Sequence, residues 1–469
     1  MREMYRPEIH LTAENGVLRA PAGVLRDGTT WHMFYQYQPT PEAGSRWGHS
    51  TSEDAPFHWD ACDDVLAPQG AETDVRAGTA LSRSGGATLV FTSVTPEGTN
   101  IQKAEAISLS GLEELSNDPL ALDPAVERCG VLIDSIGGYS SLRSPCVVPD
   151  WESDSDREQG HAGWLMLAVA GPSEDPTVLV LGKDSADDPY ELYGPLTFDG
   201  DPGLRGHRHL VSPRILRLRD EVDGDIYDIL LVTVEADGID HSGYIVGRLD
   251  GATFHVTTGM RRIDYGHDFT RPRNTTATPD SLNEATRYEY AILFGLLNGV
   301  GRLDDPTVHR SLAEEGWANA LSLPRTVTLQ GGLLYQTPMS GITDAIASSA
   351  HARSWVGLCD IPAGSKLTVD ITDEFGNVGA RVTHSGDELT VDRSMNPHHE
   401  GDKSAVAKLQ EDDSDSLSIF VDGSTLEVFA DGGQVAMASR IYFDMRDPKF
   451  VVHAEGGAKL HRAYESDLV

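Results

Sequence analysis

The stretch RPEIHLTAENGVLRAPAG, residues 6–23, contains the pattern on which the fold prediction depends. It reads as an extended segment, a turn at residues 14–16, and a short apolar strand interrupted by Pro21 and Gly23. Its core, Leu18-Arg19-Ala20-Pro21, returns in modified form as LRSP at 142–145 and VSPR at 211–214. A motif that returns along the chain indicates a repeat architecture.

Five segments rich in aromatic and branched residues recur roughly every 60 residues, and helical periodicity is scarce. They span residues 29–37, 87–94, 163–170, 227–235 and 288–297. Each follows a shorter segment with small or kinked residues, and these begin at Leu18, Val75, Leu142, Leu210 and Phe269. Small residues inside a strand indicate that another backbone approaches closely, as the inner strand of a propeller blade requires. The sequence therefore predicts five blades.

The pattern changes after the fifth unit. Residues 341–354 are polar, with Ala and Ser, and favour a short linker helix. From Trp355 onward, short alternating strands are separated by turn signals, which is typical of a β-sandwich. We expect an all-β protein: a five-bladed β-propeller over residues 1–335, a linker over 336–354, and a C-terminal β-sandwich over 355–469.

Composition narrows the classes of partner. The 469 residues carry a formal charge of -36, which argues against nucleic acid or an anionic membrane as a partner. The four cysteines lack zinc-ligand spacing and fit free thiols. The first residues, MREMYRPEIH, have no apolar leader region, and no stretch reaches the ~20 apolar residues of a membrane span. We expect a cytoplasmic protein without a metal or cofactor.

Several ordered motifs resemble those of glycoside hydrolase family 32, the invertases, levanases and inulinases that cleave β-fructofuranosides. They are RPxxH at 6–10, FYQYQP at 34–39, WGHS at 47–50, IDYGHDF at 263–269, GWANALSLPR at 316–325, DRS at 392–394, and VDGSTLEVFADGG with SRIYF between 421 and 443. Together they extend over nearly the whole chain. The resemblance implies a five-bladed propeller followed by a β-sandwich, the same fold that the repeats indicate.

The resemblance also implies a site of three carboxylates at the propeller axis: a nucleophilic Asp, an acid/base Glu and an Asp that holds sugar hydroxyls. The matching positions in this chain are Ala20, Val211 and Ser144. Retaining glycoside hydrolysis needs one carboxylate to attack the anomeric carbon and one carboxylic acid to protonate the leaving oxygen. Methyl and isopropyl groups do neither, so we expect no catalytic residues of the usual kind and no hydrolysis by the usual mechanism.

Other acidic residues lie in or near segments that the resemblance places around the funnel. They are Glu14, Glu105, Glu235, Asp264 and Asp268. Surface or hydrogen-bonding roles explain each of them, and none forms a convincing pair of nucleophile and acid. An active glycosidase with relocated catalytic groups stays open as an alternative.

Part of the sugar-binding apparatus is retained at positions that the resemblance places at or near the sugar pocket. These positions are Gln36, Trp47, Arg143, Asp264, Asp268 and Trp317. Aromatic faces and polar groups bind a sugar without catalysis, although core packing explains the two tryptophans equally well.

Arginines stand in or beside the inner-strand segments, namely Arg19, Arg76, Arg143, Arg271 and Arg273, with Arg214 close by. If they turn inward, the funnel is locally basic and suits a phosphorylated or carboxylated sugar. The alternative is that they pair with Asp and Glu between blades. Arg19 and Arg271 join the predicted substrate-binding residues.

Remaining motifs are weaker. His398-His399-Glu400 lacks metal-ligand spacing and reads as a solvated loop, while His49 and His267 read as structural donors. The sequence thus predicts a family 32-like protein that binds a small carbohydrate, a fructoside or a sugar phosphate, in the propeller funnel. A non-catalytic partner subunit of an active relative, pairing through the β-sandwich, and a homo-oligomer are further alternatives.

Overall fold

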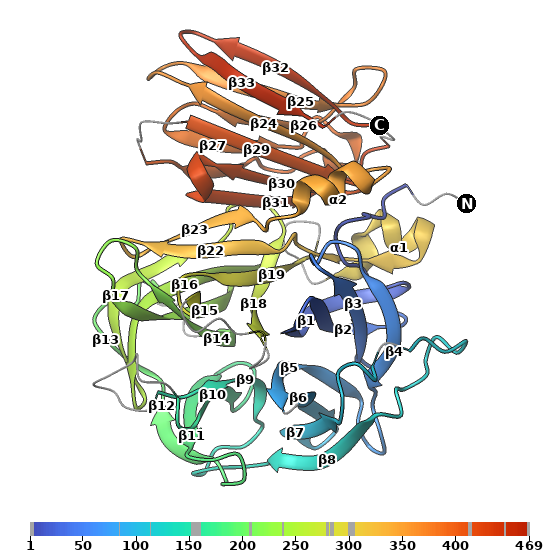
Figure 1. The fold of residues 1–469 in the computed structure, drawn as a ribbon, viewed down its shortest axis with the longest axis vertical. Coiled ribbons are helices and arrows are strands. Elements are labelled where there is room, and N and C mark those ends of the chain that lie inside the picture. The colour runs from blue at the N-terminus through green and yellow to red at the C-terminus, as the bar shows by residue number, and fades with distance from the viewer. Residues whose placement is uncertain are drawn as a thin grey trace.

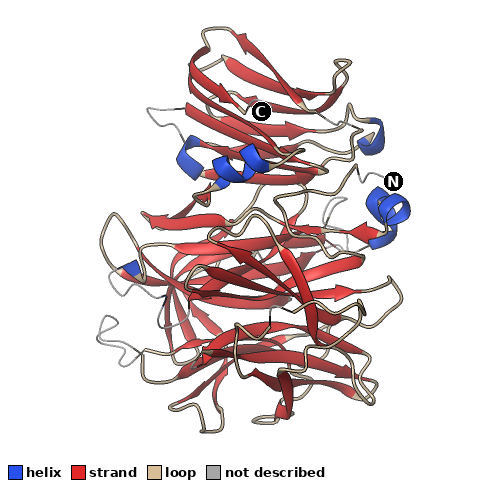
Figure 2. Ribbon diagram, turned by 45° about the vertical axis from the view of Figure 1, so that its right-hand side comes forward, coloured by secondary structure: helices blue, strands red, loops and turns tan. Residues whose placement is uncertain are grey.

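The structure, a computed structural model, describes residues 4–83, 85–112, 114–151, 161–205, 209–236, 239–277, 281, 286–298, 305–410, 415–444 and 447–466. Strands dominate it, and the few helices are short (Figure 2). A ring of β-sheets is followed by two further sheets, which confirms the predicted propeller and sandwich (Figure 1). No helix in these ranges is long and apolar enough to cross a membrane.

Five inner strands surround the centre of the ring (Figure 1). They are β1 (Gly16–Asp27), β5 (Asp74–Arg83), β9 (Arg143–Pro149), β14 (Leu210–Arg219) and β18 (Phe269–Ala277). These are the five short segments that the sequence predicts as inner strands. The second strand of each blade also falls where the sequence predicts it, except that the last begins at Ala291 because residues 287–289 form a turn.

Each inner strand is followed by antiparallel strands that complete its blade. Blade 1 continues with β2 (Thr30–Gln38), β3 (Arg46–Glu53) and β4 (Asp60–Leu66), and blade 2 with β6 (Gly86–Thr95), β7 (Gly98–Ala106) and β8 (Val126–Ile133). Blade 3 adds β10 (Trp164–Ala170), β11 (Thr177–Lys183) and β12 (Glu191–Pro195). Blade 4 adds β15 (Ile226–Ala236), β16 (Ile239–Asp250) and β17 (Thr253–Arg262), with β13 (Thr197–Asp199) at its edge, and blade 5 adds β19 (Ala291–Leu297), β22 (Arg325–Gln330) and β23 (Leu333–Pro338).

Backbone pairing between the first and last blades closes the ring. Strand β1 pairs in parallel with β18 of blade 5, with Val24 opposite Thr275. The short strand β20 (Trp317–Ala318) pairs with the start of β1, and β21 (Ala320–Leu321) pairs with β19. Helix α1 (Arg310–Glu315) precedes these two strands. Strand β1, which includes the end of the opening stretch, is therefore held by residues about 250 to 300 positions further along the chain.

Every inner strand contains a bulge against the second strand of its blade. The pairing register shifts between Leu18 and Ala20, Arg76 and Thr79, Arg143 and Cys146, Val211 and Arg214, and Thr270 and Arg273. Ser144, Ser212 and Arg271 lie in three of these bulges with φ of 54°, 53° and 51°, a region that side chains rarely adopt. Bulges redirect side chains and are common beside active sites.

The strands approach one another closely near the axis. A Cβ atom on Gly23 of blade 1 would lie 2.5 Å from the Cβ of Ala80 in blade 2. The small residues within the inner-strand motifs are therefore required by packing, as the sequence predicts.

The C-terminal sandwich consists of two five-stranded sheets around one apolar core. One sheet has the order β31-β30-β29-β24-β33 and the other β28-β27-β26-β25-β32. The strands are β24 (Arg353–Asp360), β25 (Lys366–Thr372), β26 (Val378–His384), β27 (Glu388–Asp392), β28 (Ala405–Lys408), β29 (Asp415–Asp422), β30 (Thr425–Ala430), β31 (Val435–Arg440), β32 (Lys449–Glu455) and β33 (Lys459–Glu465). Helix α2 (Ile342–Ser348) lies between β23 and β24, within the predicted linker.

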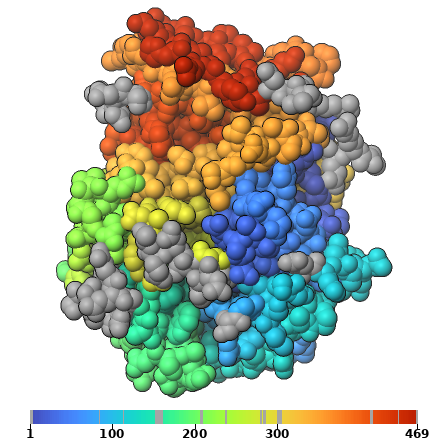
Figure 3. Space-filling view, viewed as in Figure 1, coloured from blue at the N-terminus to red at the C-terminus, as the bar shows by residue number. Residues whose placement is uncertain are grey.

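Buried ion pairs join the sandwich to the propeller, and the two parts pack directly together (Figure 3). Arg325 of β22 contacts Asp264 at 2.9 Å and Glu427 of β30 at 2.7 Å, and all three side chains are fully buried. Arg393 of the sandwich contacts Asp268 at 2.7 Å. Because these charges leave water only when both parts are in place, they fix how the parts join.

Candidate functional site

A cavity of about 400 Å³ lies where the five bulges meet at one end of the propeller axis; we call it the front cavity. Its wall includes residues from all five inner strands: Arg19 and Ala20 of β1, Arg76 and Ala77 of β5, Arg143 and Ser144 of β9, Val211, Ser212 and Arg214 of β14, and Arg271 and Arg273 of β18. The volume is in the range typical of small-molecule sites.

Ala20, Ser144 and Val211 all line the front cavity, although they are far apart in the sequence. These are the positions that the sequence predicts to match the family's three carboxylates. Each lies on the bulge of a different inner strand, so one structural device brings all three to the axis. The wall at these points consists of a methyl, a hydroxyl and an isopropyl group.

All six arginines that the sequence singles out line the front cavity. Arg271 contacts the carboxylate of Asp240, in blade 4, at 3.2 Å. Arg273 donates to the carbonyl oxygens of Pro21 and Gly78, at 3.1 and 2.7 Å, and so joins blade 5 to blades 1 and 2. The alternative of ion pairs between blades thus holds for Arg271, whereas Arg273 joins blades through backbone carbonyl groups.

Backbone carbonyl groups position two further arginines. Arg214, which is 1% exposed, donates to the carbonyl oxygen of Ser144 at 3.0 Å, and Arg143 donates to that of Gly171 at 2.5 Å. Burial lowers the pKa of Arg214 to about 10. Burial also lowers the pKa of Arg143, and the charge of Arg76 lowers it further. In both cases the first cause is burial, which disfavours the charged form of a guanidinium group.

The acidic groups on the described wall are Asp74, Glu235 and Asp240. Among the described residues, no carboxylate lies within 4.0 Å of the guanidinium groups of Arg76, Arg143, Arg214 or Arg273. Arg76 is also exposed to the cavity and has no hydrogen-bond partner for its side chain in those ranges. The front cavity is therefore locally basic in a strongly acidic protein.

Glutamines support the wall from blade 1. The side-chain oxygen of Gln36 accepts from the backbone N–H of Ala77 at 2.8 Å, and its amide donates to Ser45 at 3.0 Å. Gln38 accepts from Arg19 at 2.5 Å. Gln36 thus lines the cavity, as predicted, and its polar atoms also tie blade 1 to blade 2.

Two carboxylates face each other on blade 4. Glu235 and Asp240 are directly opposed in the antiparallel pairing of β15 with β16, and both line the front cavity. Asp240 is absent from the residues that the motifs select. The signal that would have found it is the Asp-Gly dipeptide at 237–238, which in sequence favours a hairpin and so a pairing of the residues on either side. The described wall does not include Glu14 or Glu105.

Four of the eight predicted substrate-binding residues lie away from the front cavity. Asp264 and Asp268 are buried in the ion pairs between propeller and sandwich. Trp47 is fully buried in the core of blades 1 and 2, and Trp317 packs with Tyr5 and Tyr442. These four residues lie in the hydrophobic cores and at the domain junction, and none of them lines the front cavity. Gln36, Arg143, Arg19 and Arg271 do line it.

The histidines of the motifs are buried structural groups. His49 stacks on Phe34, with ring centroids 4.7 Å apart, and His267 contacts Ser439 at 2.8 Å. His399 is also buried and accepts from the backbone N–H of Tyr442 at 3.0 Å, whereas His398 and Glu400 are exposed. The prediction of a solvated loop is therefore wrong for His399, which packs at the domain junction.

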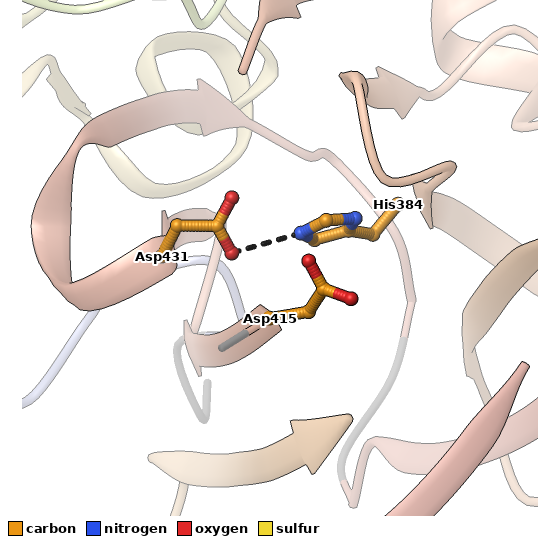
Figure 4. A group of neighbouring side chains, drawn as sticks. All are labelled: His384, Asp415 and Asp431. Carbon is orange, nitrogen blue, oxygen red and sulfur yellow. Dashed lines mark hydrogen bonds and ion pairs between the residues drawn. The ribbon is translucent and has the colours of Figure 1, made fainter. Parts of the chain in front are cut away.

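One group in the sandwich has the composition of a metal site: His384, Asp415 and Asp431 (Figure 4). His384 Nδ1 accepts from the backbone N–H of Gly386 at 3.0 Å, so its Nε2 carries the proton and donates to Asp431 at 2.9 Å. A metal would need a free lone pair at Nε2. Asp415 accepts from the backbone N–H of Ile361 at 2.6 Å. The group is satisfied by internal hydrogen bonds.

Two family models match the chain, the glycosyl hydrolases family 32 N-terminal domain over residues 10–338 and the family 32 C-terminal region over residues 365–465. The chain belongs to glycosyl hydrolase family 32. The matched ranges cover the propeller through the end of β23 and most of the sandwich.

Curated relatives of this family 32 chain include two bacterial enzymes. The sucrose-6-phosphate hydrolase of Bacillus subtilis is 24% identical, over 93% of this chain and 89% of its own length. That of Escherichia coli is also 24% identical, over 97% and 92%.

Similar solved structures include a Bombyx mori β-fructofuranosidase, with a TM-score of 0.73 and 20% identity, covering 99% of this chain and 94% of that one. The sucrose-6-phosphate hydrolase of Lactobacillus gasseri has a TM-score of 0.73 and 18% identity, covering 97% and 92%. These structures share the fold.

Proposed function

We propose that this family 32 protein binds a phosphorylated sugar in the front cavity and does not hydrolyse fructosides by the usual two-carboxylate mechanism. The observation that carries the proposal is the group of four arginines, Arg76, Arg143, Arg214 and Arg273, without a carboxylate partner in the described chain. Two of them, Arg214 and Arg273, are buried, and an anionic ligand would compensate a buried positive charge that has no carboxylate partner.

A phosphate group suits this wall for geometric reasons. A guanidinium group presents its N–H donors in a planar fork that matches phosphate oxygens, and backbone carbonyl groups already orient Arg143, Arg214 and Arg273. The cavity also has room for the sugar, and Ser144, Ser212 and Gln36 offer polar groups on its wall. The names of the curated relatives, sucrose-6-phosphate hydrolases, support a phosphorylated sugar as the ligand class.

The same wall lacks the groups for the usual chemistry. Attack on the anomeric carbon needs a carboxylate about 5 Å from a proton-donating carboxyl group. Ala20 and Val211 provide neither group at the positions that match the family's nucleophile and acid/base. The arginines of the front cavity instead bind and orient an anion, because they donate hydrogen bonds and carry positive charge.

We also propose that the protein acts in the cytoplasm. The four free cysteines support a reducing compartment, because disulfides form and persist in oxidising ones. Fractionation of cells that express the full chain tests this: the protein is expected in the cytoplasmic fraction, and its recovery from the medium or an extracytoplasmic fraction would contradict the proposal.

Ligand binding tests the main proposal directly. Titration calorimetry with fructose 6-phosphate, sucrose 6-phosphate, fructose and sucrose is expected to give saturable binding for a phosphorylated sugar and at least tenfold weaker binding for its neutral counterpart. Arg76→Gln should weaken phosphate binding about tenfold, since one charge-assisted contact is lost. Arg248→Gln is the matched control, because Arg248 pairs with Asp225 on the surface. Equal affinity for neutral and phosphorylated sugars would overturn the proposal.

Restoring the carboxylates tests the loss of hydrolysis. The triple variant Ala20→Asp, Ser144→Asp, Val211→Glu should release fructose from sucrose or sucrose 6-phosphate, while the unaltered protein should not. The circular dichroism spectra of the two proteins serve as the folding control. Clear hydrolysis by the unaltered protein would refute the predicted inactivity.

A second candidate function is glycoside hydrolysis with relocated carboxylates, favoured by the opposed pair Glu235 and Asp240. Directly opposed residues have Cβ atoms about 5 Å apart, so the two carboxyl groups belong to neighbouring side chains; a retaining enzyme needs its carboxyl groups about 5 Å apart. Against it, the carboxylate of Asp240 is already held by Arg271 at 3.2 Å. If the protein hydrolyses a fructoside, and Glu235→Gln abolishes the activity, this candidate replaces the first.

A further inference from the structure

One acidic side chain on the described wall of the front cavity has no partner, and it is that of Glu235 in β15. The side chain is exposed, and the described part of the chain gives it neither a hydrogen bond nor an ion pair. The other two acidic groups of this wall are occupied: Asp74 accepts from the backbone N–H of Ser45 at 3.0 Å, and Asp240 contacts Arg271 at 3.2 Å. The negative charge of Glu235 is therefore open to a ligand.

A second carboxylate lies beside Glu235. Because Glu235 is directly opposed to Asp240 in the pairing of β15 with β16, both side chains lie on the same face of the blade 4 sheet. Like charges at directly opposed positions destabilise a sheet. Arg271 of blade 5 compensates Asp240 through Nε, while its Nη1 donates to the carbonyl oxygen of Arg19 at 3.0 Å. A cation beside Glu235 would relieve the remaining repulsion.

The positive groups of the front cavity are held apart from Glu235. Several arginines line the same cavity, yet none of them pairs with it. Arg143 donates to the carbonyl oxygens of Ser141 and Gly171, at 3.1 and 2.5 Å. Arg76 lies on blade 2, and blade 3 lies between it and Glu235 on blade 4 (Figure 1). A guanidinium group and a carboxylate that reach each other form a charge-assisted hydrogen bond, so the structure keeps these charges separate.

Separated charges on one wall suit a ligand that carries separated charges. A phosphate group carries about two negative charges at neutral pH and matches the donors of a guanidinium group. An ammonium group is the matching partner for Glu235. A sugar hydroxyl also donates to a carboxylate, but it leaves the negative charge and the repulsion from Asp240 uncompensated.

We propose that Glu235 makes the front cavity selective for a phosphorylated amino sugar. The phosphate would lie against Arg76 and Arg143, and the ammonium group would donate to Glu235. This selectivity rests on the proposed function, because the arginines must hold the phosphate group. The arginines alone would bind an amino sugar phosphate and its hydroxyl parent equally, so the difference between the two ligands reports on Glu235.

Titration calorimetry with two matched pairs of sugar phosphates tests the selectivity on the full chain. Glucosamine 6-phosphate is compared with glucose 6-phosphate, and 1-amino-1-deoxyfructose 6-phosphate with fructose 6-phosphate. In each pair an ammonium group replaces one hydroxyl group. We expect at least one amino compound to bind about fivefold tighter than its parent, the upper range for a solvent-accessible ion pair.

The outcomes separate this selectivity from the proposed function. If the parents bind and neither amino compound binds tighter than its parent, the selectivity is overturned while the proposed function stands. If none of the four compounds binds, the selectivity is overturned as well, and sucrose 6-phosphate then shows whether the proposed function still holds.

Variants assign the preference to one side chain. Glu235→Gln keeps the size but removes the charge, so the amino compound should bind no tighter than its parent, and binding of the parent shows that the variant is folded. Arg76→Gln should weaken both compounds by the same factor, because both carry the phosphate. Glu191→Gln, which alters an exposed carboxylate of β12 outside the cavity, is the matched control and should change neither affinity. A preference that survives Glu235→Gln would overturn the proposal.

Discussion

Replacing Asp264 by Asn is expected to lower the free energy of unfolding by about 3 kcal/mol, in the absence of any sugar. Asp264 Oδ2 contacts Arg325 at 2.9 Å, and Oδ1 accepts from the backbone N–H groups of Gly266 and Ala438, at 2.7 and 3.1 Å. These three bonds are buried and bring together the propeller and the sandwich. An amide has one oxygen for these three donors, so its NH₂ group must face a donor.

The magnitude follows from burial. Breaking a buried ion pair by changing one partner costs roughly 3–5 kcal/mol, and the lower end applies because Glu427 still contacts Arg325 at 2.7 Å. The control is Asp225→Asn, which removes a carboxylate that pairs with Arg248 at a similar distance, 2.7 Å, but with both side chains about half exposed. Exposed pairs contribute about 0–1 kcal/mol.

Urea unfolding followed by tryptophan fluorescence and by circular dichroism measures both variants beside the unaltered protein. Two probes are needed because a two-part chain need not unfold in one step. The reasoning is refuted if Asp264→Asn and Asp225→Asn shift the unfolding midpoint equally. If Asp264→Asn instead leaves stability unchanged and weakens sugar binding, the residue belongs to the ligand site after all.

Three further outcomes are expected. Burial opposes the charged form of His10, but its contacts with Asp422 and Glu427 outweigh this effect and raise its pKa above 6.5. The protonated ring therefore stabilises the fold fully below pH 6.5, and this stabilisation is lost as the pH rises through the folded pKa. Urea unfolding from about pH 6 to about pH 9 should show a loss of stability, and His10→Gln should reduce that loss. Cys129 is the exposed cysteine, so a thiol reagent should label one cysteine in the native protein and four in denaturant. This labelling should be slow, because burial and then the charge of Glu105 raise the pKa of Cys129. Rapid labelling of all four cysteines in the native protein would contradict the packing. Gly23→Val should lower the thermal midpoint, because even a Cβ would lie 2.5 Å from that of Ala80, and overpacking costs about 1–3 kcal/mol; an unchanged midpoint would show that the inner strands tolerate side chains there.

The local basicity of the front cavity has a consequence for how a ligand reaches it. The chain's charge of -36 repels anions at long range, while the arginines at the axis attract them at short range. Salt screens the exposed charges more strongly than the buried ones. Moderate salt should therefore raise the association rate of a sugar phosphate and weaken its affinity only modestly.

The sequence by itself determined the architecture. The recurrence of LRAP-like segments and of aromatic strands predicted the five inner strands. These segments can be recognised in the sequence because crowded backbones at the axis require small residues, as the close approach of Gly23 to Ala80 shows. The motifs also selected Ala20, Ser144 and Val211, which share one wall because each lies on a bulge of its own inner strand.

Only the tertiary structure decided which motif residues face the cavity. Trp47, Trp317, Asp264 and Asp268 belong to motifs as specific as that of Arg143, yet they are buried in cores and at the domain junction. A motif indicates that a certain residue type is required at a position, but packing and ligand binding both impose such requirements. The direction of each side chain depends on bulges, on register and on contacts such as that of Arg273 with Gly78, 195 positions away, which no local pattern encodes.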